Sequence, residues 1–346
     1  MAATLTTAPV AEPFTDTPRG PDTTDAVVVE ALTKRFGDRT AVDHVSFSVP
    51  VGTVAGLIGP NGAGKTPIMA MLLGLVQPTS GTASIFGTPI SRRSGYLHRV
   101  GALIESPSFH PAVSGIDNLR SLAALTGRRG AALAAEIDEL IDIVGLTGRG
   151  TDRYGAYSLG MKQRLGIAAA LLGNPDLVIL DEPTNGLDPM GMQDIRNLIK
   201  RISGNGRTVI VSSHLLSELE QVCDWLIVLD HGGLVHLGPP ETLGGTVESL
   251  VLRIDGAGRL DDLAAIARSA QLPVTVDTDR GELTVALDGD VDPARLAGEI
   301  NRRAHAAGIV LTELHHARAD LEARYLNLVN FDDGSPNDTV QRKATS

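Results

Sequence analysis

Residues 59–66 fit the pattern G-x-x-x-x-G-K-[ST], which is the phosphate-binding loop of nucleoside-triphosphate enzymes. They read Gly59-Pro60-Asn61-Gly62-Ala63-Gly64-Lys65-Thr66. The apolar run 54–58 before the loop predicts a buried strand, and the pattern over 68–75 after it predicts a helix. In this order the backbone N–H groups of the loop point at a phosphate at the start of a helix, whose dipole also favours anions. We therefore expect ATP or GTP here, with Lys65 reaching the β- and γ-phosphates and the Thr66 hydroxyl holding Mg²⁺.

A second apolar strand pattern ends in two acids. Residues 178–180 are Val-Ile-Leu, and Asp181 and Glu182 follow them at the expected carboxyl end of the strand. Beside a phosphate loop, Asp181 is placed to orient Mg²⁺ and its waters, and Glu182 to polarise an attacking water. Adjacent acids after a strand are also compatible with a solvated turn. The phosphate loop favours the catalytic interpretation.

Three shorter motifs accompany the two acids. Before them, the stretch Tyr-Ser-Leu-Gly-Met-Lys-Gln-Arg at 157–164 precedes a helix pattern at 165–172. Its serine hydroxyl and backbone N–H groups predict a second anion site at a helix N-terminus. After them comes Asn-Gly-Leu-Asp at 185–188, and the strand pattern 208–211 is followed by Ser-Ser-His at 212–214.

This ordered set resembles the nucleotide-binding subunits of ABC transporters, and the resemblance covers roughly residues 27–239. It implies an α/β fold with a P-loop NTPase core of ABC type that hydrolyses ATP. In that family the Ser-Gly loop of one subunit completes the ATP site of another. The resemblance thus implies that Ser158 and Gly160 contact the γ-phosphate bound on a second copy of the chain. It also implies that Asp188 lines the dimer seam and that His214 contacts the γ-phosphate and holds Glu182 and the water.

Two further positions are assigned through the resemblance. Phe36 stands where the family places an aromatic that stacks on adenine, although a phenylalanine before a glycine is also compatible with a core position. Glu105 stands where most members have Gln. A carboxylate can ligate Mg²⁺ through oxygen, and a surface acid before a turn is the alternative. Glu105 and the Tyr-Ser-Leu-Gly-Met form of the signature are both similar to the branch that exports antibiotics and other small molecules.

Pro67 departs from the family, which has Thr or Ser at this position. Proline fits sterically in a first helical turn, but it lacks the N–H that the α-phosphate normally receives. It also disfavours the helical region for its predecessor, Thr66, whose hydroxyl is expected to hold Mg²⁺. We therefore expect weaker nucleotide binding than in the relatives, unless the loop has adjusted around the proline.

Composition restricts the compartment and the partners. A formal net charge of −11 and a pI near 5.3 argue against a nucleic-acid partner, whose binders show a basic face. The single cysteine, Cys223, excludes a disulfide scaffold and is expected to be a buried small hydrophobe. No apolar run approaches the ~18 residues that a membrane-spanning helix needs. The N-terminus also lacks the layout of a secretion signal. A transporter pore would therefore belong to another chain.

The domain boundaries follow from changes in composition. Residues 1–26 and 331–346 are predicted to be disordered tails. Residues 27–245 are predicted to form the ATPase domain, and about 107–155 its helical subdomain, which in the family receives the coupling helices of the membrane partner. Residues 246–330 are predicted to form an accessory α+β domain.

The accessory domain shows its own alternation of patterns. Alternating apolar residues at 250–254 predict a strand, and Leu263, Ile266 and Ala267 share one helical face. Further patterns follow at 274–276, 283–287, 293–307 and 309–314. Their order, β-α-β-β-α-β, is ferredoxin-like. The unit carries no catalytic constellation, and its end at 321–326 resembles the accessory domain of drug-exporter ATPases. Regulation or support of a dimer is the expected role.

Together these features predict the ATPase subunit of an ABC exporter, acting as a homodimer on a separate integral membrane permease at the cytoplasmic face of the membrane. An importer subunit remains an alternative, although importers commonly carry a strand-rich C-terminal domain. A soluble ABC-type ATPase of DNA repair would have a long coiled coil between loop and signature, whereas here about 90 residues without heptads separate them. A ribosome-associated factor would usually carry two cassettes and basic linkers.

Overall fold

The computed structural model describes residues 25–90, 95–104, 109–204, 206–243, 248–254, 257–269, 271–278, 280–287 and 291–318. Strand β1 (Asp25–Phe36) begins inside the predicted tail 1–26, because Asp25 already pairs with Pro50 of the neighbouring strand. The rest of that tail and the whole of 331–346 lie outside the described residues.

A six-stranded sheet forms the centre of the first unit, in the order β10-β9-β3-β8-β7-β6. Its members are β3 (Val54–Ile58), β6 (Val100–Leu103), β7 (Leu177–Leu180), β8 (Thr208–Ser213), β9 (Trp225–Asp230) and β10 (Gly233–Gly238). All neighbours are parallel except β9 and β10, which form a hairpin at the edge. Strands covered on both faces are continuously apolar, and every residue of β3 and β7 is buried. The predicted strands 54–58, 178–180 and 208–211 are confirmed.

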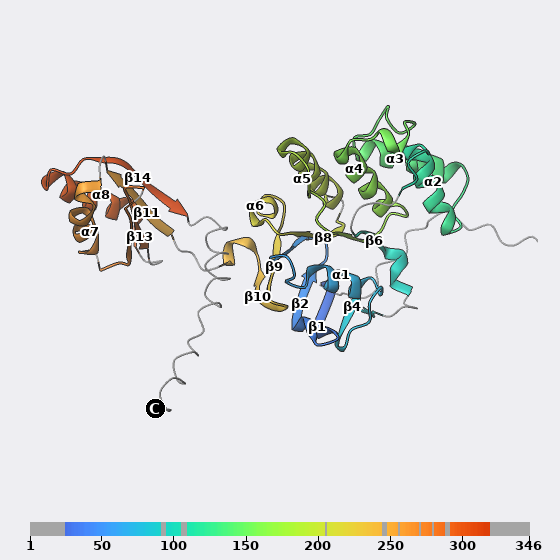
Figure 1. Cartoon of the computed structure of the whole chain (residues 1–346), viewed down its shortest axis with the longest axis horizontal. Coiled ribbons are helices and arrows are strands. Elements are labelled where there is room, and N and C mark those ends of the chain that lie inside the picture. The colour runs from blue at the N-terminus through green and yellow to red at the C-terminus, as the bar shows by residue number, and fades with distance from the viewer. Residues whose placement is uncertain are drawn as a thin grey trace, which may run out of the picture.

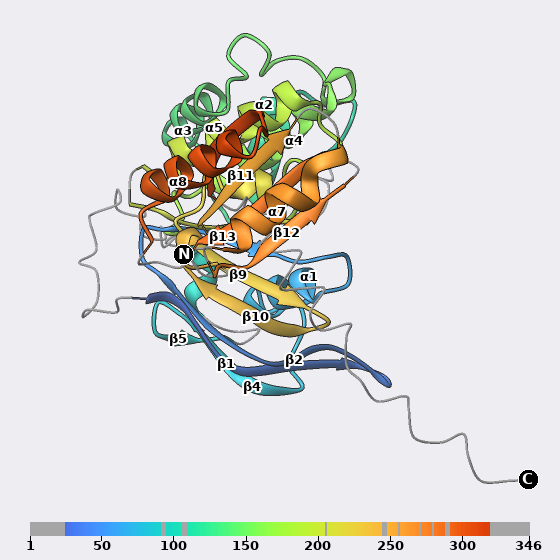
Figure 2. The same ribbon diagram turned by 90° about the vertical axis from the view of Figure 1, so that its left-hand side faces the viewer.

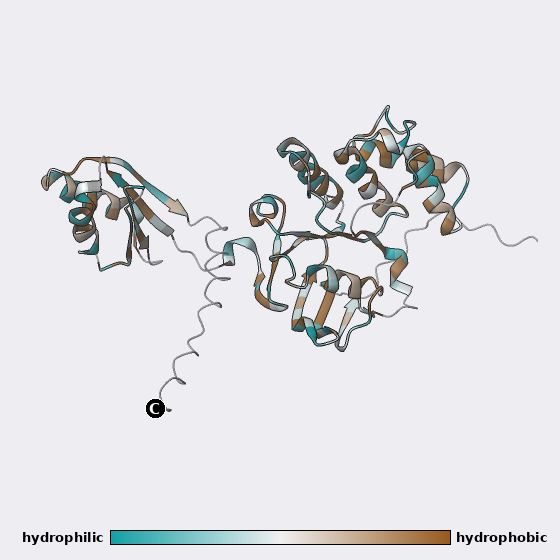
Figure 3. Cartoon of the chain, viewed as in Figure 1, coloured by the Kyte–Doolittle hydropathy of each residue, from teal (hydrophilic) through white to brown (hydrophobic). Residues whose placement is uncertain are grey.

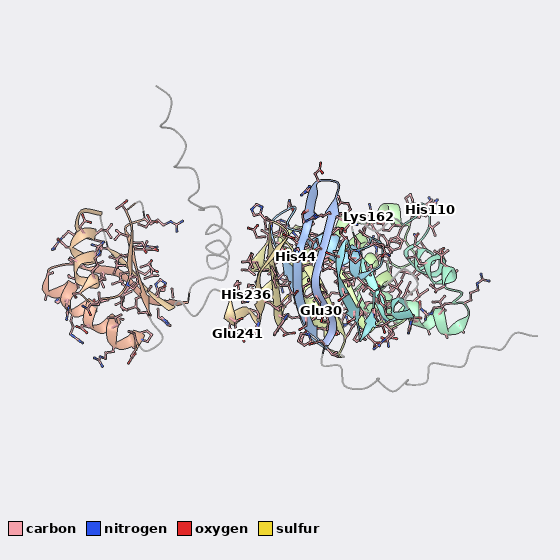
Figure 4. The ribbon with its side chains drawn as sticks, turned by 90° about the horizontal axis from the view of Figure 1, so that it is seen from below. Glu30, His44, His110, Lys162, His236 and Glu241 are labelled. Atoms are coloured by element: carbon pink, nitrogen blue, oxygen red, sulfur yellow. The ribbon has the colours of Figure 1, made fainter. Side chains whose placement is uncertain are left out.

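A second, antiparallel sheet lies on one side of the central sheet, with helix α1 (Lys65–Leu72) between them (Figure 1). It has the order β2-β1-β4-β5 and contains β2 (Arg39–Pro50), β4 (Ser80–Ile85) and β5 (Thr88–Pro89). Its inner residues share one hydrophobic core with α1 and the central sheet. Its outer face is polar, with Glu30 and His44 exposed (Figure 4).

Helices α4 (Leu159–Leu171) and α5 (Pro189–Ser203) cover the other face of the central sheet, near α2 (Gly115–Leu125), α3 (Ala131–Ile143) and the short α6 (Leu216–Leu219) (Figure 1). They close a second core with the sheet. In Figure 3 the strands of this unit are largely hydrophobic, whereas the helices carry both kinds of residue. Among the described residues, no helix is long and apolar enough to cross a bilayer. Cys223 lies in this core as predicted, and burial raises the pKa of its thiol.

Two predicted helices begin earlier than the apolar periodicity indicated. Helix α1 starts at Lys65 rather than 68, and α4 starts at Leu159 rather than 165. Gly64, with a left-handed φ of 104°, precedes α1, and the Ser158 hydroxyl caps α4 by accepting from the Met161 N–H. The first turns, which begin Lys65-Thr66-Pro67 and Leu159-Gly160-Met161, contain polar residues, proline and glycine, so apolar periodicity does not extend into them.

The second unit is a four-stranded antiparallel sheet in the order β12-β13-β11-β14, with α7 and α8 packed on one face (Figure 2). Its elements are β11 (Glu248–Ile254), α7 (Leu260–Arg268), β12 (Val274–Asp277), β13 (Glu282–Leu287), α8 (Pro293–Ala306) and β14 (Leu311–Arg318). This order and connectivity confirm the ferredoxin-like prediction. Leu263 and Ala267 are fully buried and Ile266 partly, in a core that belongs to this unit alone. The last strand begins at Leu311, two residues later than predicted.

Candidate active site

An open pocket of about 590 Å³ lies where the phosphate loop, the β1–β2 hairpin and the ends of β7 and β8 meet. The parallel strands β3, β7 and β8 all end at the same edge of the sheet, which brings their following residues together. The pocket is lined by Phe36, Arg39, Ala41, Pro60, Asn61, Gly62, Gly64, Lys65, Thr66, Pro67, Glu182, Asn185 and His214.

The phosphate loop has a backbone that only glycine accepts at its key positions. Gly62 and Gly64 have φ of 90° and 104°, in the left-handed region. A Cβ on Gly64 would lie 2.7 Å from the carbonyl oxygen of Ala41, and one on Gly59 would lie 2.4 Å from that of Leu229. The glycines therefore let the loop fold tightly against β2 and β9. This tight conformation is compatible with the predicted cradle of backbone N–H groups.

Lys65 carries a positive charge into this loop. Its side chain is 6% exposed, and its Nζ donates to the carbonyl oxygen of Gly59 at 2.7 Å. The same ammonium lies 3.3 Å from Oε1 of Glu182. A buried cation at the N-terminus of a helix is a feature of the anion sites that phosphates occupy.

Thr66 and Asp181 bring oxygen ligands together behind the loop. The Thr66 hydroxyl donates to Oδ2 of Asp181 at 3.0 Å, and the Ser212 hydroxyl donates to Oδ1 at 2.6 Å. Asp181 is only 7% exposed. The two hydrogen bonds, one to each oxygen, fix the orientation of its carboxylate. Hydroxyl and carboxylate oxygens are the ligands that Mg²⁺ prefers, so these residues fit that ion.

Glu182 and His214 form a pair at the pocket wall. Oε2 of Glu182 and Nδ1 of His214 share a hydrogen bond of 2.8 Å. Glu182 has a φ of 45°, a left-handed conformation that is strained for a residue with a side chain. Its N–H donates to the Ser212 hydroxyl at 2.8 Å, which helps to hold that conformation. Glu182 lines the pocket, where its carboxylate can accept a proton from a water.

Phe36 lies at the mouth of the pocket rather than in a core. Half of its side chain is exposed, so the alternative interpretation as a core residue is wrong. It pairs across the hairpin with Arg39, which lines the same pocket. The Lys34 ammonium lies 4.9 Å from the centroid of the ring. An exposed aromatic face at this place is available for stacking on a nucleobase.

Ser158, Gly160 and Asp188 do not line the pocket of their own chain. Ser158 caps α4, and Asp188 caps α5 by accepting from the Gly191 N–H at 2.8 Å. Two apolar side chains beside these caps, Leu159 and Met190, are 50% and 78% exposed.

The effect of Pro67 on Thr66 was predicted wrongly. Thr66 lies in the first turn of α1 despite the proline that follows it. The Ile68 N–H donates to the Gly64 carbonyl at 3.1 Å, which closes this turn and outweighs the steric preference before proline. Pro67 itself lines the pocket, as expected. Glu105, predicted as a magnesium ligand, lies outside the described residues.

Replacing Pro67 with threonine is expected to tighten Mg-ATP binding by about 10- to 100-fold. The restored N–H can donate to a phosphate, and a hydrogen bond to a charged group contributes about 1.5–3 kcal/mol. The gain is smaller if a water already takes that place. Calorimetry at equal Mg²⁺ should give the same gain for Pro67→Ala, which restores the N–H without a hydroxyl. Equal affinities of all three proteins would show that the loop has adjusted around the proline.

Three pocket residues had no predicted role. Arg39 and Ala41 reach the pocket only because the β1–β2 hairpin folds over the phosphate loop, and Asn185 lies in a motif whose last residue alone was assigned. Ser212 was quoted beside His214, but its hydrogen bonds to Asp181 and Glu182 depend on the pairing of β7 with β8. Which residues of β7 and β8 lie opposite each other cannot be read from a single sequence.

Comparison with known proteins agrees with this geometry. The family model described as ABC transporter matches residues 42–185. The bacitracin transport ATP-binding protein BcrA of Enterococcus faecalis is 36% identical over 305 residues, which is 88% of this chain and 96% of the relative. The lantibiotic transport ATP-binding protein SrtF of Streptococcus pyogenes is 41% identical over 60% of this chain and 88% of its own length.

A solved structure supports the same assignment. CbiO1 from Clostridium perfringens, described as part of the ABC transporter complex CbiONQ, superposes with a TM-score of 0.58 at 26% identity and covers 63% of this chain and 90% of its own. The pocket, the order of the motifs and these similarities lead to one conclusion. The chain belongs to the ATP-binding proteins of ABC transporters.

Proposed function

We propose that the chain powers the efflux of a small molecule or antibiotic through a separate integral membrane permease. The convergence of Lys65, Thr66, Glu182 and His214 on one pocket carries the ATPase part of the proposal. The transport of bacitracin and of a lantibiotic, named for the two relatives, supports the class of cargo. The chain would then act at the cytoplasmic face of the membrane, attached through the permease.

In this proposal different residues of the pocket contact different parts of ATP. The ring of Phe36 stacks on adenine, the N–H groups of residues 59–66 receive the phosphates, and Lys65 neutralises charge at the β- and γ-phosphates. Thr66 and Asp181 would hold Mg²⁺, joined by Glu105, and the ion would neutralise charge on the phosphate oxygens when bound. Glu182 accepts the proton of the attacking water, and His214 holds the carboxylate in place through their 2.8 Å hydrogen bond.

The site becomes complete only with a second copy of the chain. Ser158 and Gly160 of that copy cover the γ-phosphate, and Asp188 lines the seam between the copies. The cap positions of Ser158 and Asp188, at helix N-termini outside the chain's own pocket, support this arrangement. Two ATP molecules would hold the copies together, and hydrolysis would release them and reset the permease.

The proposal divides the work between the two units. Residues 25–245 hold all the nucleotide motifs, and within them about 107–155 form the helical subdomain that meets the permease. Residues 246–330 form the accessory domain, which supports the dimer or regulates it. Separate hydrophobic cores in the two units support this division.

Truncation after Gly245 is therefore expected to leave a folded core that binds ATP with nearly the parent affinity. As far as its residues are described, the lost unit carries none of the pocket residues and shares no core with the rest. Calorimetry with ATP and size-exclusion chromatography measure the two expectations, unchanged binding and a weaker dimer. The same truncated core with Lys65→Ala is the control for specific binding. A well-folded truncated core that cannot bind ATP would overturn this division.

Transport itself is tested in cells. The chain is expressed together with a candidate permease, a membrane protein of about six apolar helices, and resistance to peptide antibiotics such as bacitracin is measured. We expect higher resistance with the parent chain and none with Glu182→Gln at equal expression. Equal resistance with both would contradict the proposed function.

A further inference from the structure

A buried carboxylate lies directly behind the Glu182–His214 pair. Glu218, on the short helix α6 beside β8 (Figure 1), is 6% exposed. Its Oε2 accepts two hydrogen bonds, one from the Thr184 hydroxyl at 2.6 Å and one from the Ser213 hydroxyl at 3.2 Å. Both hydroxyl groups belong to buried residues. This cluster of three side chains does not line the pocket.

The two donors, Thr184 and Ser213, lie close to Glu182 and His214 in the chain. Thr184 lies two residues after Glu182, at the start of the loop that leads to Asn185 in the pocket. Ser213 immediately precedes His214, and its hydroxyl also accepts from the N–H of Leu215 at 3.0 Å. One carboxylate oxygen thus joins the segment that carries Glu182 to the segment that carries His214. The two segments are also joined by the hydrogen bond of Glu182 with His214 and by those of the Ser212 hydroxyl with Asp181 and the Glu182 N–H.

The Glu182 segment needs such support. Its left-handed φ of 45° is sparsely populated by residues with a side chain, and such strain persists only where the surrounding structure holds it. Ser212 holds the Glu182 N–H from one side, and the Thr184 hydroxyl bonded to Glu218 fixes the chain just after it. A buried carboxylate is costly unless it is hydrogen-bonded, and here it stays satisfied only while both segments keep their places.

We infer that Glu218 is a positioning residue for ATP hydrolysis, which sets the distance between Glu182 and His214 through Thr184 and Ser213. It touches neither the nucleotide pocket nor the water. Its removal lets the two segments shift separately, and a shift of about 1 Å at a catalytic group can lower the rate by about 100-fold. Because the phosphate loop is not part of the cluster, ATP affinity is retained. The inference rests on the proposed ATP hydrolysis.

The test measures kcat, KM and ATP affinity separately in the full-length chain. Glu218→Ala is expected to lower kcat by about 10- to 100-fold, while the Kd for ATP changes by less than about threefold. Glu218→Gln should recover part of the loss, because its amide oxygen still accepts a hydroxyl. Glu220→Ala is the matched control: Glu220 is exposed two residues away and is expected to change nothing.

A second variant tests the same inference if Glu218→Ala does not fold. Thr184→Val keeps the shape but removes the stronger donor, and it should also lower kcat with ATP affinity retained. Equal losses of kcat and ATP affinity in all variants, or a folded Glu218→Ala with the parent kcat, would overturn the inference. If Glu182→Gln abolishes the parent's activity while a folded Glu218→Ala keeps the parent kcat, the inference alone fails. If the parent hydrolyses no ATP, the proposed function fails with it.

Discussion

Glu182→Gln is expected to lose almost all ATP turnover while it still binds ATP. A glutamine cannot accept the proton of the attacking water, and general-base catalysis typically contributes 10²- to 10⁴-fold to the rate. The amide keeps an oxygen that can hydrogen-bond to His214, so the wall of the pocket stays in place. Steady-state phosphate release and calorimetry with ATP measure the two quantities.

The variant should also accumulate as an ATP-bound dimer. The substitution removes a negative charge that lies 3.3 Å from the Lys65 ammonium, which lowers the repulsion that the pocket exerts on phosphates. With hydrolysis blocked, nothing releases the two copies, and size-exclusion chromatography with ATP should show the dimer. Glu241→Gln, an exposed carboxylate outside the pocket (Figure 4), is the control. Hydrolysis by Glu182→Gln near the parent rate would show that another group is the base.

The parallel sheet was predictable because its strands are buried on both faces. Runs such as 54–58 and 178–180 are apolar at every position or nearly so, and such runs are typical of central parallel strands. Helix starts were not predictable from periodicity, because Gly64 and Ser158 set them through backbone geometry and capping. The order of elements in the ferredoxin-like unit was predictable, because its strands show a two-residue apolar period and its helices a period of about 3.6 residues. Turn residues separate these segments.

The core of the site was predictable for a topological reason. Lys65, Asp181, Glu182 and His214 each follow a strand or the loop after it, and parallel strands end at one edge of the sheet. The roles of residues that reach the site only through contacts between segments distant in the sequence were not predictable. Arg39 arrives through a hairpin of the other sheet, and Glu218 becomes significant only because it is buried against two hydroxyl groups.

The second large effect concerns sites shared between copies. A chain with Lys65→Ala loses the cation of its own phosphate loop, and a chain with Ser158→Ala loses the hydroxyl offered to the partner. Each variant alone should form dimers with little activity, because both of their sites carry a lesion. In a mixed dimer one site carries both lesions and the other carries none. We therefore expect roughly half of the parent activity if the two sites act independently, and a measurable recovery if they are coupled.

The arrangement of the two lesions provides the decisive control. Heterodimers are isolated through two different affinity tags. One kind combines Lys65→Ala with Ser158→Ala chains, and the other combines a doubly substituted chain with the parent chain. If the site is shared, only the first kind contains an intact site and hydrolyses ATP. If each chain completes its own site, only the second kind does. Activity confined to the first heterodimer is the result that the shared ATP site predicts, and activity confined to the second would contradict it.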